Sequence, residues 1–90
     1  MSFDEAVSTL RGWVGDEVAV RLEPETTELR GRLAEREEAE PDSAFFSLAG
    51  ETPTGVAFAL FRDAARTVRR DDERLVVQQG EVTVTVTRAG

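Results

Sequence analysis

Apolar residues recur along this chain with two different periods, and each period predicts a different kind of element. The first period is helical, because four apolar residues near the start share the 3, 4 and 7 spacing of one helix face: Phe3, Ala6, Val7 and Leu10. Ser2 and Glu5 form an S-x-x-E capping box, in which each side chain accepts a hydrogen bond from the other residue's backbone amide. Gly12 offers a left-handed position at which a helix can stop. These features predict one helix over about residues 3–11.

After the helix, apolar and polar residues alternate, which is the period of a β-strand. The first alternating run, VAVRLE at residues 18–23, leads into a turn at Glu23–Thr26, where the fixed φ of Pro24 is useful. The second run, residues 29–34, carries Gly31 on its apolar face. A glycine in mid-strand permits a sharp bend or a bulge, as a small barrel needs at its corners.

The rest of the chain continues as short strands separated by turns. Five further segments have a strand pattern: Ala44–Leu48, Val56–Phe61, Thr67–Arg70, Arg74–Gln79 and Val82–Arg88. The segment Val56–Phe61 is apolar on both faces, which predicts a central or doubly covered strand. Gln79-Gly80-Glu81-Val82 fits a two-residue hairpin of type II′. The remaining connections are expected to be exposed loops at Glu35–Asp42 and Ala49–Gly55, a short helical turn near Arg62–Ala65 and a turn at Asp71-Asp72.

Together these elements predict a mainly β protein in which an N-terminal α-helix precedes a strongly bent, antiparallel small barrel of six or seven short strands. Ninety residues are enough for one compact core, so we expect a single domain over residues 1–90. The helix would occupy residues 1–12 and the barrel residues 16–88.

The charge of the chain narrows the classes of partner. The net charge is −7, and all 11 basic residues are arginines. Residues 1–60 hold 13 acidic residues and 5 arginines, a net charge of −8, whereas residues 61–90 hold 5 acidic residues and 6 arginines, a net charge of +1. A protein that binds duplex nucleic acid gains its affinity from cations, so this balance disfavours nucleic acid as the main ligand. Without a basic, apolar leader or a membrane-length apolar run, we expect a cytoplasmic protein with no membrane partner.

The residue inventory argues against catalysis. The chain has no histidine, cysteine, lysine or tyrosine, which excludes most pairs of nucleophile and base. We therefore expect no enzymatic activity and no cofactor. The acidic run Glu35–Asp42 and the triplet Asp71–Glu73 have the oxygen ligands of a calcium or magnesium site, but they lack EF-hand spacing, and solvated loops are the favoured interpretation. The loop Gly50–Gly55 lacks the G-K-[ST] of a phosphate-binding loop.

Arginines and aromatic residues are the candidates for a binding surface. Six arginines are predicted to contribute, from two outward strand faces and a cluster in the second half: Arg30, Arg32, Arg62, Arg66, Arg69 and Arg70. They could contact RNA, a nucleotide or an acidic protein surface, or they could pair with acidic residues across strands, which we favour. Trp13, Phe45 and Phe61 could stack on bases beside them, although burial in the core is the favoured interpretation.

Residues 10–33, LRGWVGDEVAVRLEPETTELRGRL, with the helix before them, resemble the opening of Sm-like proteins. That family has an N-terminal helix, a V-x-V-x-L strand, a turn, and a strand with an apolar–x–Gly–x–apolar centre, which here is Leu29, Gly31 and Leu33. The resemblance implies an SH3-like small barrel that assembles through its strand edges. It implies no RNA-binding residue, because AEREEAEPD stands where the family has its Asp and Asn, and the later apolar–x–x–Arg–Gly signature is absent.

The leading prediction is therefore a non-enzymatic interaction or assembly module that forms a homo-oligomer, or binds a protein partner, through its strand edges. The alternative is a protein that binds RNA or a nucleotide with its arginine-bearing strand faces. The two differ in how the arginines are used, since paired arginines support the first and an open arginine patch beside an exposed aromatic residue supports the second.

Overall fold

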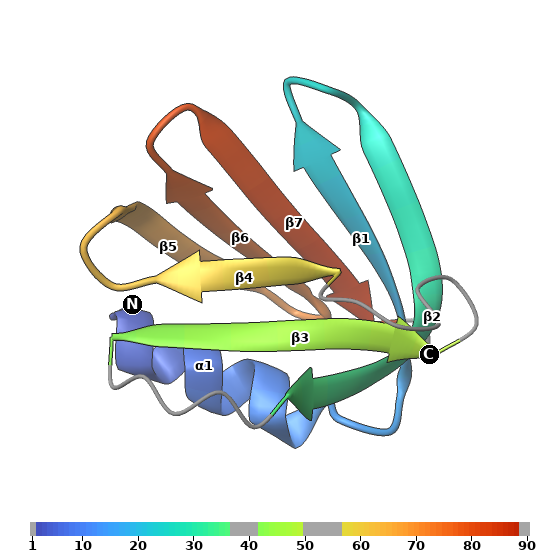
Figure 1. Ribbon diagram of the computed structural model, residues 1–90. Helices are drawn as coiled ribbons and strands as arrows, with labels where there is room; N and C mark the ends of the chain where they lie inside the picture. The colour runs from blue at the N-terminus through green and yellow to red at the C-terminus, as the bar shows by residue number, and fades with distance from the viewer. Residues whose placement is uncertain (1, 37–41, 50–56, 89–90) are drawn as a thin grey trace.

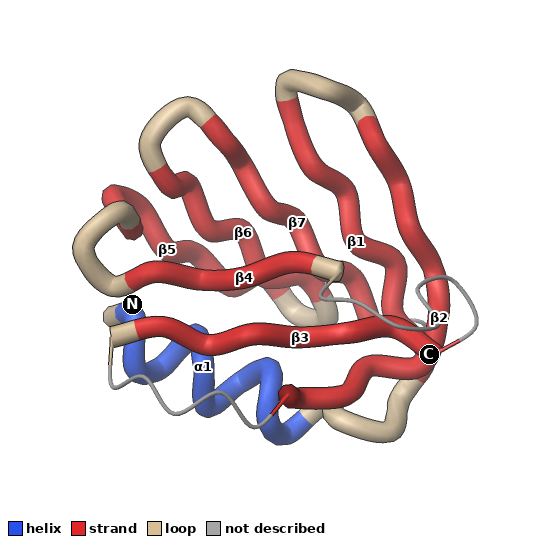
Figure 2. Tube along the Cα trace, viewed as in Figure 1, coloured by secondary structure: helices blue, strands red, loops and turns tan. Residues whose placement is uncertain are grey.

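The computed structural model describes residues 2–36, 42–49 and 57–88, which form one helix and seven strands (Figures 1 and 2). The elements in chain order are α1 (Phe3–Gly12), β1 (Glu17–Glu23), β2 (Thr27–Arg36), β3 (Ser43–Ala49), β4 (Phe58–Phe61), β5 (Ala65–Asp71), β6 (Arg74–Gln79) and β7 (Val82–Arg88). All strands belong to one antiparallel sheet in the order β4-β3-β2-β1-β7-β6-β5. The mainly β fold with an N-terminal helix and seven strands is therefore confirmed. The sheet is strongly curled, but it does not close, because β4 and β5 do not pair.

Helix α1 begins with the predicted capping box. The Ser2 hydroxyl accepts a hydrogen bond from the Glu5 amide at 3.2 Å, and the Glu5 carboxylate accepts one from the Ser2 amide at 3.1 Å. The predicted apolar face is buried at Ala6, Val7 and Leu10. It packs under the curled sheet, at the lower end in Figure 1.

The prediction that Gly12 ends the helix in a left-handed conformation is wrong. Gly12 is the last helical residue, and the left-handed glycine is Gly15, with φ of +95°. The physical reason lies in the next strand pair, since the Gly15 amide donates to the Leu33 carbonyl at 2.9 Å and the Leu33 amide donates to the Asp16 carbonyl at 3.0 Å. The reversal at Gly15 thus aligns the chain for pairing with β2.

Strand β2 forms the corner of the sheet. Its first part, Thr27–Arg32, pairs with β1, and its second part, Arg32–Arg36, pairs with β3. Figure 1 shows the strand bending where it changes partner. The predicted bend at Gly31 is confirmed, and the structure adds a reason for the glycine. A Cβ at this position would lie 2.5 Å from the Ala49 carbonyl oxygen, so only glycine allows the end of β3 to approach.

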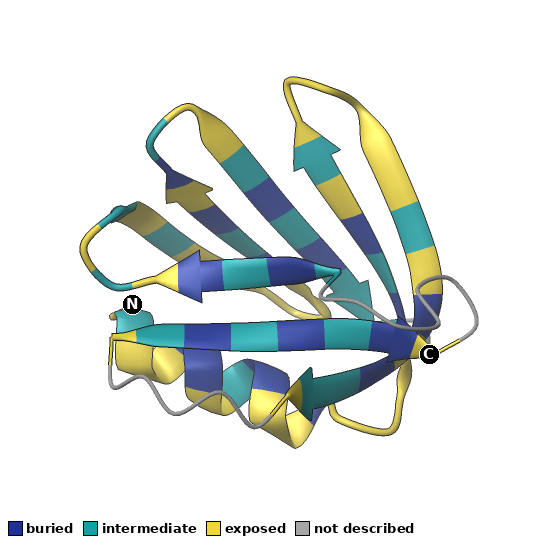
Figure 3. Ribbon diagram, in the orientation of Figure 1, coloured by how far each residue is buried: buried dark blue, intermediate teal, exposed yellow. Residues whose placement is uncertain are grey.

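The core is formed by alternate residues of the strands together with the inner face of the helix (Figure 3). The fully buried large side chains come from both halves of the chain: Leu10, Val18, Val20, Leu33, Phe46, Leu48, Leu60, Leu75, Val77 and Val86. The predicted hairpin at Gly80 is confirmed, with Gln79 paired to Val82 and a φ of +57° at the first loop residue. A turn is present before β5 at residues 62–64, but Ala65 already belongs to β5. The turn after β5 lies at residues 72–73, because Asp71 still pairs with Arg74, and Asp72 adopts a φ of +52°. Glu35 and Ala49, predicted to begin loops, belong to β2 and β3.

The prediction that Val56–Phe61 is a central or doubly covered strand is wrong. The described part, β4, is a terminal strand of the sheet, and Phe61 at its end is 43% exposed. Phe58 and Leu60 point into the core, whereas Phe61 contacts the ring of Phe45 edge to face, with 6.0 Å between ring centroids. Aromatic packing on the outer face accounts for the apolar residue there.

A glutamine side chain joins β4 to the far part of the sheet. Gln79 at the end of β6 is the only buried polar residue among those described, with 9% of its surface exposed. Its Oε1 accepts a hydrogen bond from the Phe61 amide at 2.6 Å, and its Nε2 donates one to the Ala59 carbonyl at 2.9 Å. The carboxamide therefore substitutes for the backbone of a neighbouring strand along part of β4.

This bridge predicts a large loss of stability for Gln79→Leu. The substitution leaves the Phe61 amide and the Ala59 carbonyl without partners, so we expect the free energy of unfolding to fall by about 2–4 kcal/mol in urea titrations. Gln78→Leu is the matched control, because Gln78 is exposed on the same strand, and its effect should stay within about 0.5 kcal/mol. Equal effects at the two positions would show that the bridge contributes nothing.

The close approach at β2 predicts opposite effects for two glycine-to-alanine changes. Gly31→Ala should destabilise by about 1–3 kcal/mol, because the new methyl group meets a backbone carbonyl. Gly12→Ala should stabilise by up to about 1 kcal/mol, because Gly12 is helical and a methyl group there meets nothing within 4 Å. Thermal unfolding of the two variants and the wild type measures both changes in stability. An unchanged stability of Gly31→Ala would contradict the steric explanation.

Candidate functional site

The six arginines predicted to bind a partner do not form one patch. Arg30 and Arg32 lie on the outer face of β2, and Arg62 lies in the turn between β4 and β5. The other three lie on β5, where Arg66 occupies a bulge. Arg69 lies on the outer face of the sheet, opposite Val76 of β6. Arg70 lies on the other face, opposite the buried Leu75. Neighbouring arginines on one strand therefore point to opposite faces of the sheet.

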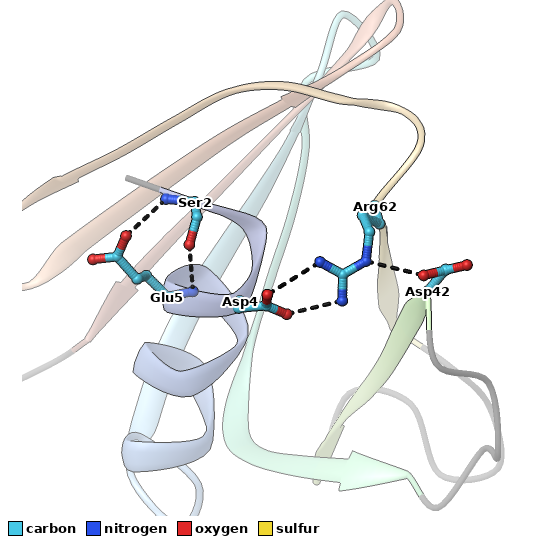
Figure 4. Close-up of polar contacts among 5 residues, drawn as sticks. All are labelled: Ser2, Asp4, Glu5, Asp42 and Arg62. Atoms are coloured by element: carbon cyan, nitrogen blue, oxygen red, sulfur yellow. Dashed lines mark hydrogen bonds and ion pairs between the residues drawn. The ribbon is translucent and has the colours of Figure 1, made fainter.

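Arg62 fastens the helix to the sheet (Figure 4). Its guanidinium donates to both Asp4 carboxylate oxygens, at 2.8 and 3.2 Å, and to Asp42 at 3.0 Å. It also lies over the Phe3 ring, with 4.7 Å between the guanidinium carbon and the ring centroid. The hydrogen bonds that Arg62 donates hold the pKa of Asp4 below its ordinary value, and donating to Asp4 and Asp42 raises the pKa of Arg62. Arg62 therefore links the helix to the segments before β3 and after β4.

Arg70 takes part in a second contact between the sheet and the N-terminal segment, at the ring of Trp13. The Trp13 ring is buried, as favoured from the sequence, and two guanidinium groups lie over it, from Arg70 at 5.8 Å and from Arg88 at 5.5 Å. Arg88 also bonds to the Glu73 carboxylate and lies 3.5 Å from Asp16. The pKa of Glu73 is lowered, mainly by its hydrogen bond from Arg88.

The remaining arginines divide between paired and unpaired. Arg30 contacts Glu28 at 3.3 Å, but both residues lie on β2, so this is not the cross-strand pairing that the sequence favoured. Within residues 2–36, 42–49 and 57–88, no carboxylate lies within ion-pair distance of Arg32, Arg66 or Arg69. The predicted pairing across strands is therefore not observed for these arginines: Arg30 pairs within β2, Arg62 pairs with carboxylates outside the strands, and the other three have no carboxylate partner in the described ranges.

A shallow groove on the outer face of the sheet is lined by one of the six predicted arginines, Arg69, and by two others, Arg21 and Arg74. Its volume is about 450 Å³, and its floor consists of small residues, among them Thr85 and Thr87 of β7. Arg21 of β1 borders one side, and Arg69 and Arg74 border the other. The register explains this arrangement, since β1, β7 and β6 bring Arg21, Thr85 and Val76 into one row. Arg74 was not among the six predicted residues, although the alternation along β6 already places it on the outer face.

The free edge of β5 is the second candidate surface. β5 pairs with β6 along one edge, and among the described residues no backbone hydrogen bond joins its other edge to another strand. Five of its seven residues are exposed, including Arg66, Arg69 and Arg70. The exposed Phe61 does not complete a stacking site with these arginines, because the cation–π contacts of the described chain go to Phe3 and Trp13.

The acidic segments show no metal-binding arrangement where they are described. Glu35 pairs with Arg11 at 2.9 Å and Asp42 pairs with Arg62, while the rest of the run, residues 37–41, lies outside the described part of the chain. No group of three or more acidic residues within the described ranges is placed to hold a metal ion. The loop Gly50–Gly55 also lies outside these ranges. The only described helix is too short and too polar to cross a bilayer.

Comparison of the chain with protein-family models, with curated proteins and with solved structures found no match in any of the three. The similarity of residues 10–33 to Sm-like proteins thus stays a prediction from those residues.

The Arg62–Asp4 contact predicts a pH-dependent stability difference between the wild type and Asp4→Asn. Because the folded-state pKa of Asp4 is lowered, its contribution is present above the pKa of the unfolded chain and disappears as the pH falls through the folded-state pKa. The wild type should be the more stable protein at pH 7, and the two unfolding curves should converge at acidic pH, once Asp4 is protonated in the folded protein. Asp63→Asn, an exposed residue without an ion pair among the described side chains, is the control. A difference that persists at pH 2 would contradict the electrostatic origin.

Proposed function

We propose that this protein is a non-enzymatic interaction and assembly module that associates through the free edge of β5, and that its first partner is a second copy of the same chain. The observation that carries the proposal is the unpaired, exposed strand Ala65–Asp71 at the end of an open sheet. An unpaired edge presents a row of amide and carbonyl groups that an extended segment of a partner can complete.

The two ends of the sheet differ in this respect. At β4 the Phe61 amide and the Ala59 carbonyl are already bonded to Gln79, and the Phe61 carbonyl accepts from the Ala64 amide at 3.1 Å. At β5 no such substitute is present among the described residues. A partner would therefore meet one receptive edge, and the contact between two copies would join unlike surfaces.

The charge of β5 selects the partner surface. Pairing two copies of β5 in antiparallel fashion about Val68 would set Arg66 opposite Arg70, and like charges directly opposite destabilise a strand pair. The bulge at Arg66 further discourages indiscriminate pairing. A surface rich in carboxylates is favoured instead, and residues 1–60 of the same chain, with a net charge of −8, supply one.

The carboxylates support a non-enzymatic role. Where the pKa of a described carboxylate is shifted, at Asp4, Glu5 and Glu73, it is lowered by hydrogen bonds from neighbours. A general acid at neutral pH needs the opposite shift. Together with the absence of histidine, cysteine, lysine and tyrosine, this leaves binding as the better-supported role.

The outer groove favours a second candidate function, which is the binding of RNA or a nucleotide. Arg21, Arg69 and Arg74 face its threonine floor, and guanidinium groups bind phosphate with good geometry. Glu23 and Glu28 also line the groove and weaken its attraction for anions, which is why this function stands second.

Native mass spectrometry at low salt tests the first proposal with two matched double variants. We expect a defined multimer for the wild type and a monomer for Arg66→Glu with Arg69→Glu, because the reversed charges repel an acidic partner surface. Arg30→Glu with Arg32→Glu makes the same change in net charge on β2 and should remain multimeric. Raising the ionic strength should shift the wild type towards the monomer.

A monomeric wild type would contradict self-association. Retained RNA or nucleotide mass would move the second candidate to first place. That mass should then be lost in Arg21→Gln with Arg74→Gln, which leaves β5 unchanged.

A further inference from the structure

The upper end of the curled sheet holds an apolar cavity between β4 and the facing strands. Its volume is about 310 Å³, and the residues that line it include Leu22, Phe58, Phe61, Gln79, Val82 and Val84. The helix lies at the opposite end of the sheet, below the turns of the β1–β2 and β6–β7 hairpins in Figure 1. The cavity therefore occurs where the sheet is open and no helix covers it.

Among the described residues, no buried side-chain polar atom in the walls of this cavity lacks a hydrogen-bond partner. Gln79 is its buried polar residue, and both ends of the Gln79 carboxamide are already bonded to β4. Two of the three large apolar side chains that are most exposed in the described chain, Phe61 and Val82 at 43% each, stand at its walls. An occupant would gain affinity from hydrocarbon contact rather than from hydrogen bonds.

Acidic residues surround the neighbouring hollow, which shares Leu22 and Val82 with the cavity. This second hollow has a volume of about 360 Å³ and is lined by Glu23, Glu25 and Glu81 around Pro24. Among the described residues no arginine lines either hollow, although Arg21 lies 3.6 Å from Glu23. A molecule whose apolar part enters the cavity would thus have its polar end in a field of carboxylates.

We propose that this cavity binds the hydrocarbon chain of a small amphiphilic cation, of the chemical class of the primary alkylamines. The apolar lining takes the chain, the carboxylates at Glu23, Glu25 and Glu81 attract the ammonium group, and the volume matches the lower end of the range for small-molecule sites. The cavity is separate from the β5 edge, so the proposal does not depend on self-association.

Three probes of equal chain length test the proposal: hexylammonium, hexanol and hexanoate. In two-dimensional amide NMR titrations we expect hexylammonium to bind most tightly and hexanoate least tightly, with shifts at Leu22, Phe61 and Val82. Octylammonium should bind about 15-fold more tightly than hexylammonium, since each added methylene group contributes about fourfold. High salt should lower the affinity of hexylammonium towards that of hexanol, because salt screens the attraction between the ammonium group and the carboxylates.

Two pairs of variants separate the apolar and the charged parts of the site. Ala64→Leu places a larger side chain in the cavity wall and should abolish binding, whereas Ala19→Leu on the outer face of β1 should not change it. The double variant Glu25→Gln with Glu81→Gln should lower the affinity for hexylammonium by about tenfold at low salt and leave the affinity for hexanol unchanged. Glu17→Gln with Glu28→Gln removes the same charge elsewhere and should have little effect.

The proposal is overturned if no probe shifts the cavity residues or if Ala64→Leu binds like the wild type. It is also overturned if hexanoate or hexanol binds as tightly as hexylammonium at low salt. The amide shifts of the wild type and of the variants are measured at individual residues. They are therefore interpretable whether the protein is a monomer or a multimer.

Discussion

The hydrogen bonds of one buried carboxamide decide how far this sheet can close. Gln79 joins the end of β6 to the backbone of β4 through a donor and an acceptor at once, at 2.9 and 2.6 Å. Because a buried amide is costly unless both of its ends are bonded, the side chain holds β4 at a fixed distance from β6. A link that runs through a side chain is longer than a direct backbone hydrogen bond between two strands. The sheet therefore stays open beside Gln79. The apolar cavity at the upper end lies beside this bridge, and the unpaired edge of β5 is at the other end of the open sheet from β4.

Several arginines of this acidic chain connect elements of the fold to one another. Arg62 ties Asp4 in the helix to Asp42 before β3, and Arg70 and Arg88 enclose the buried ring of Trp13. These contacts attach the helix and the segment after it to the sheet, together with the Arg11–Glu35 ion pair, the backbone hydrogen bonds to Leu33 and apolar packing. A chain rich in carboxylates gains most from arginine in such places, because the planar guanidinium can bond to carboxylates and lie over a ring at the same time. The arginines left for partners are those on the outer face and on the edge of β5.

The two ends of the molecule are consequently different in chemistry. The helix covers the lower end, where the charges are paired, and the upper end combines apolar walls with the carboxylates of the hairpin turns. The edge of β5 carries positive charge between them. Opposite charges on separate surfaces of one small domain suit contacts between unlike surfaces, which build rings or chains of copies rather than two-fold dimers.

The sequence by itself determined the elements whose signals are local. The capping box and 3.6-residue period defined α1, the alternation defined the strands, and Gly80 defined the β6–β7 hairpin, because each depends on residues only a few positions apart. Only the tertiary structure decided which strands are terminal, why Gly31 must be glycine, and which arginines find carboxylates. The apolar neighbours of Phe61 predicted a central strand, and its exposure follows from the terminal position of β4 in the described sheet. Gln79 gave no signal in the sequence, since its partners lie 18 and 20 residues away. Strand order and edge contacts depend on pairings between distant segments, which local periodicity does not encode.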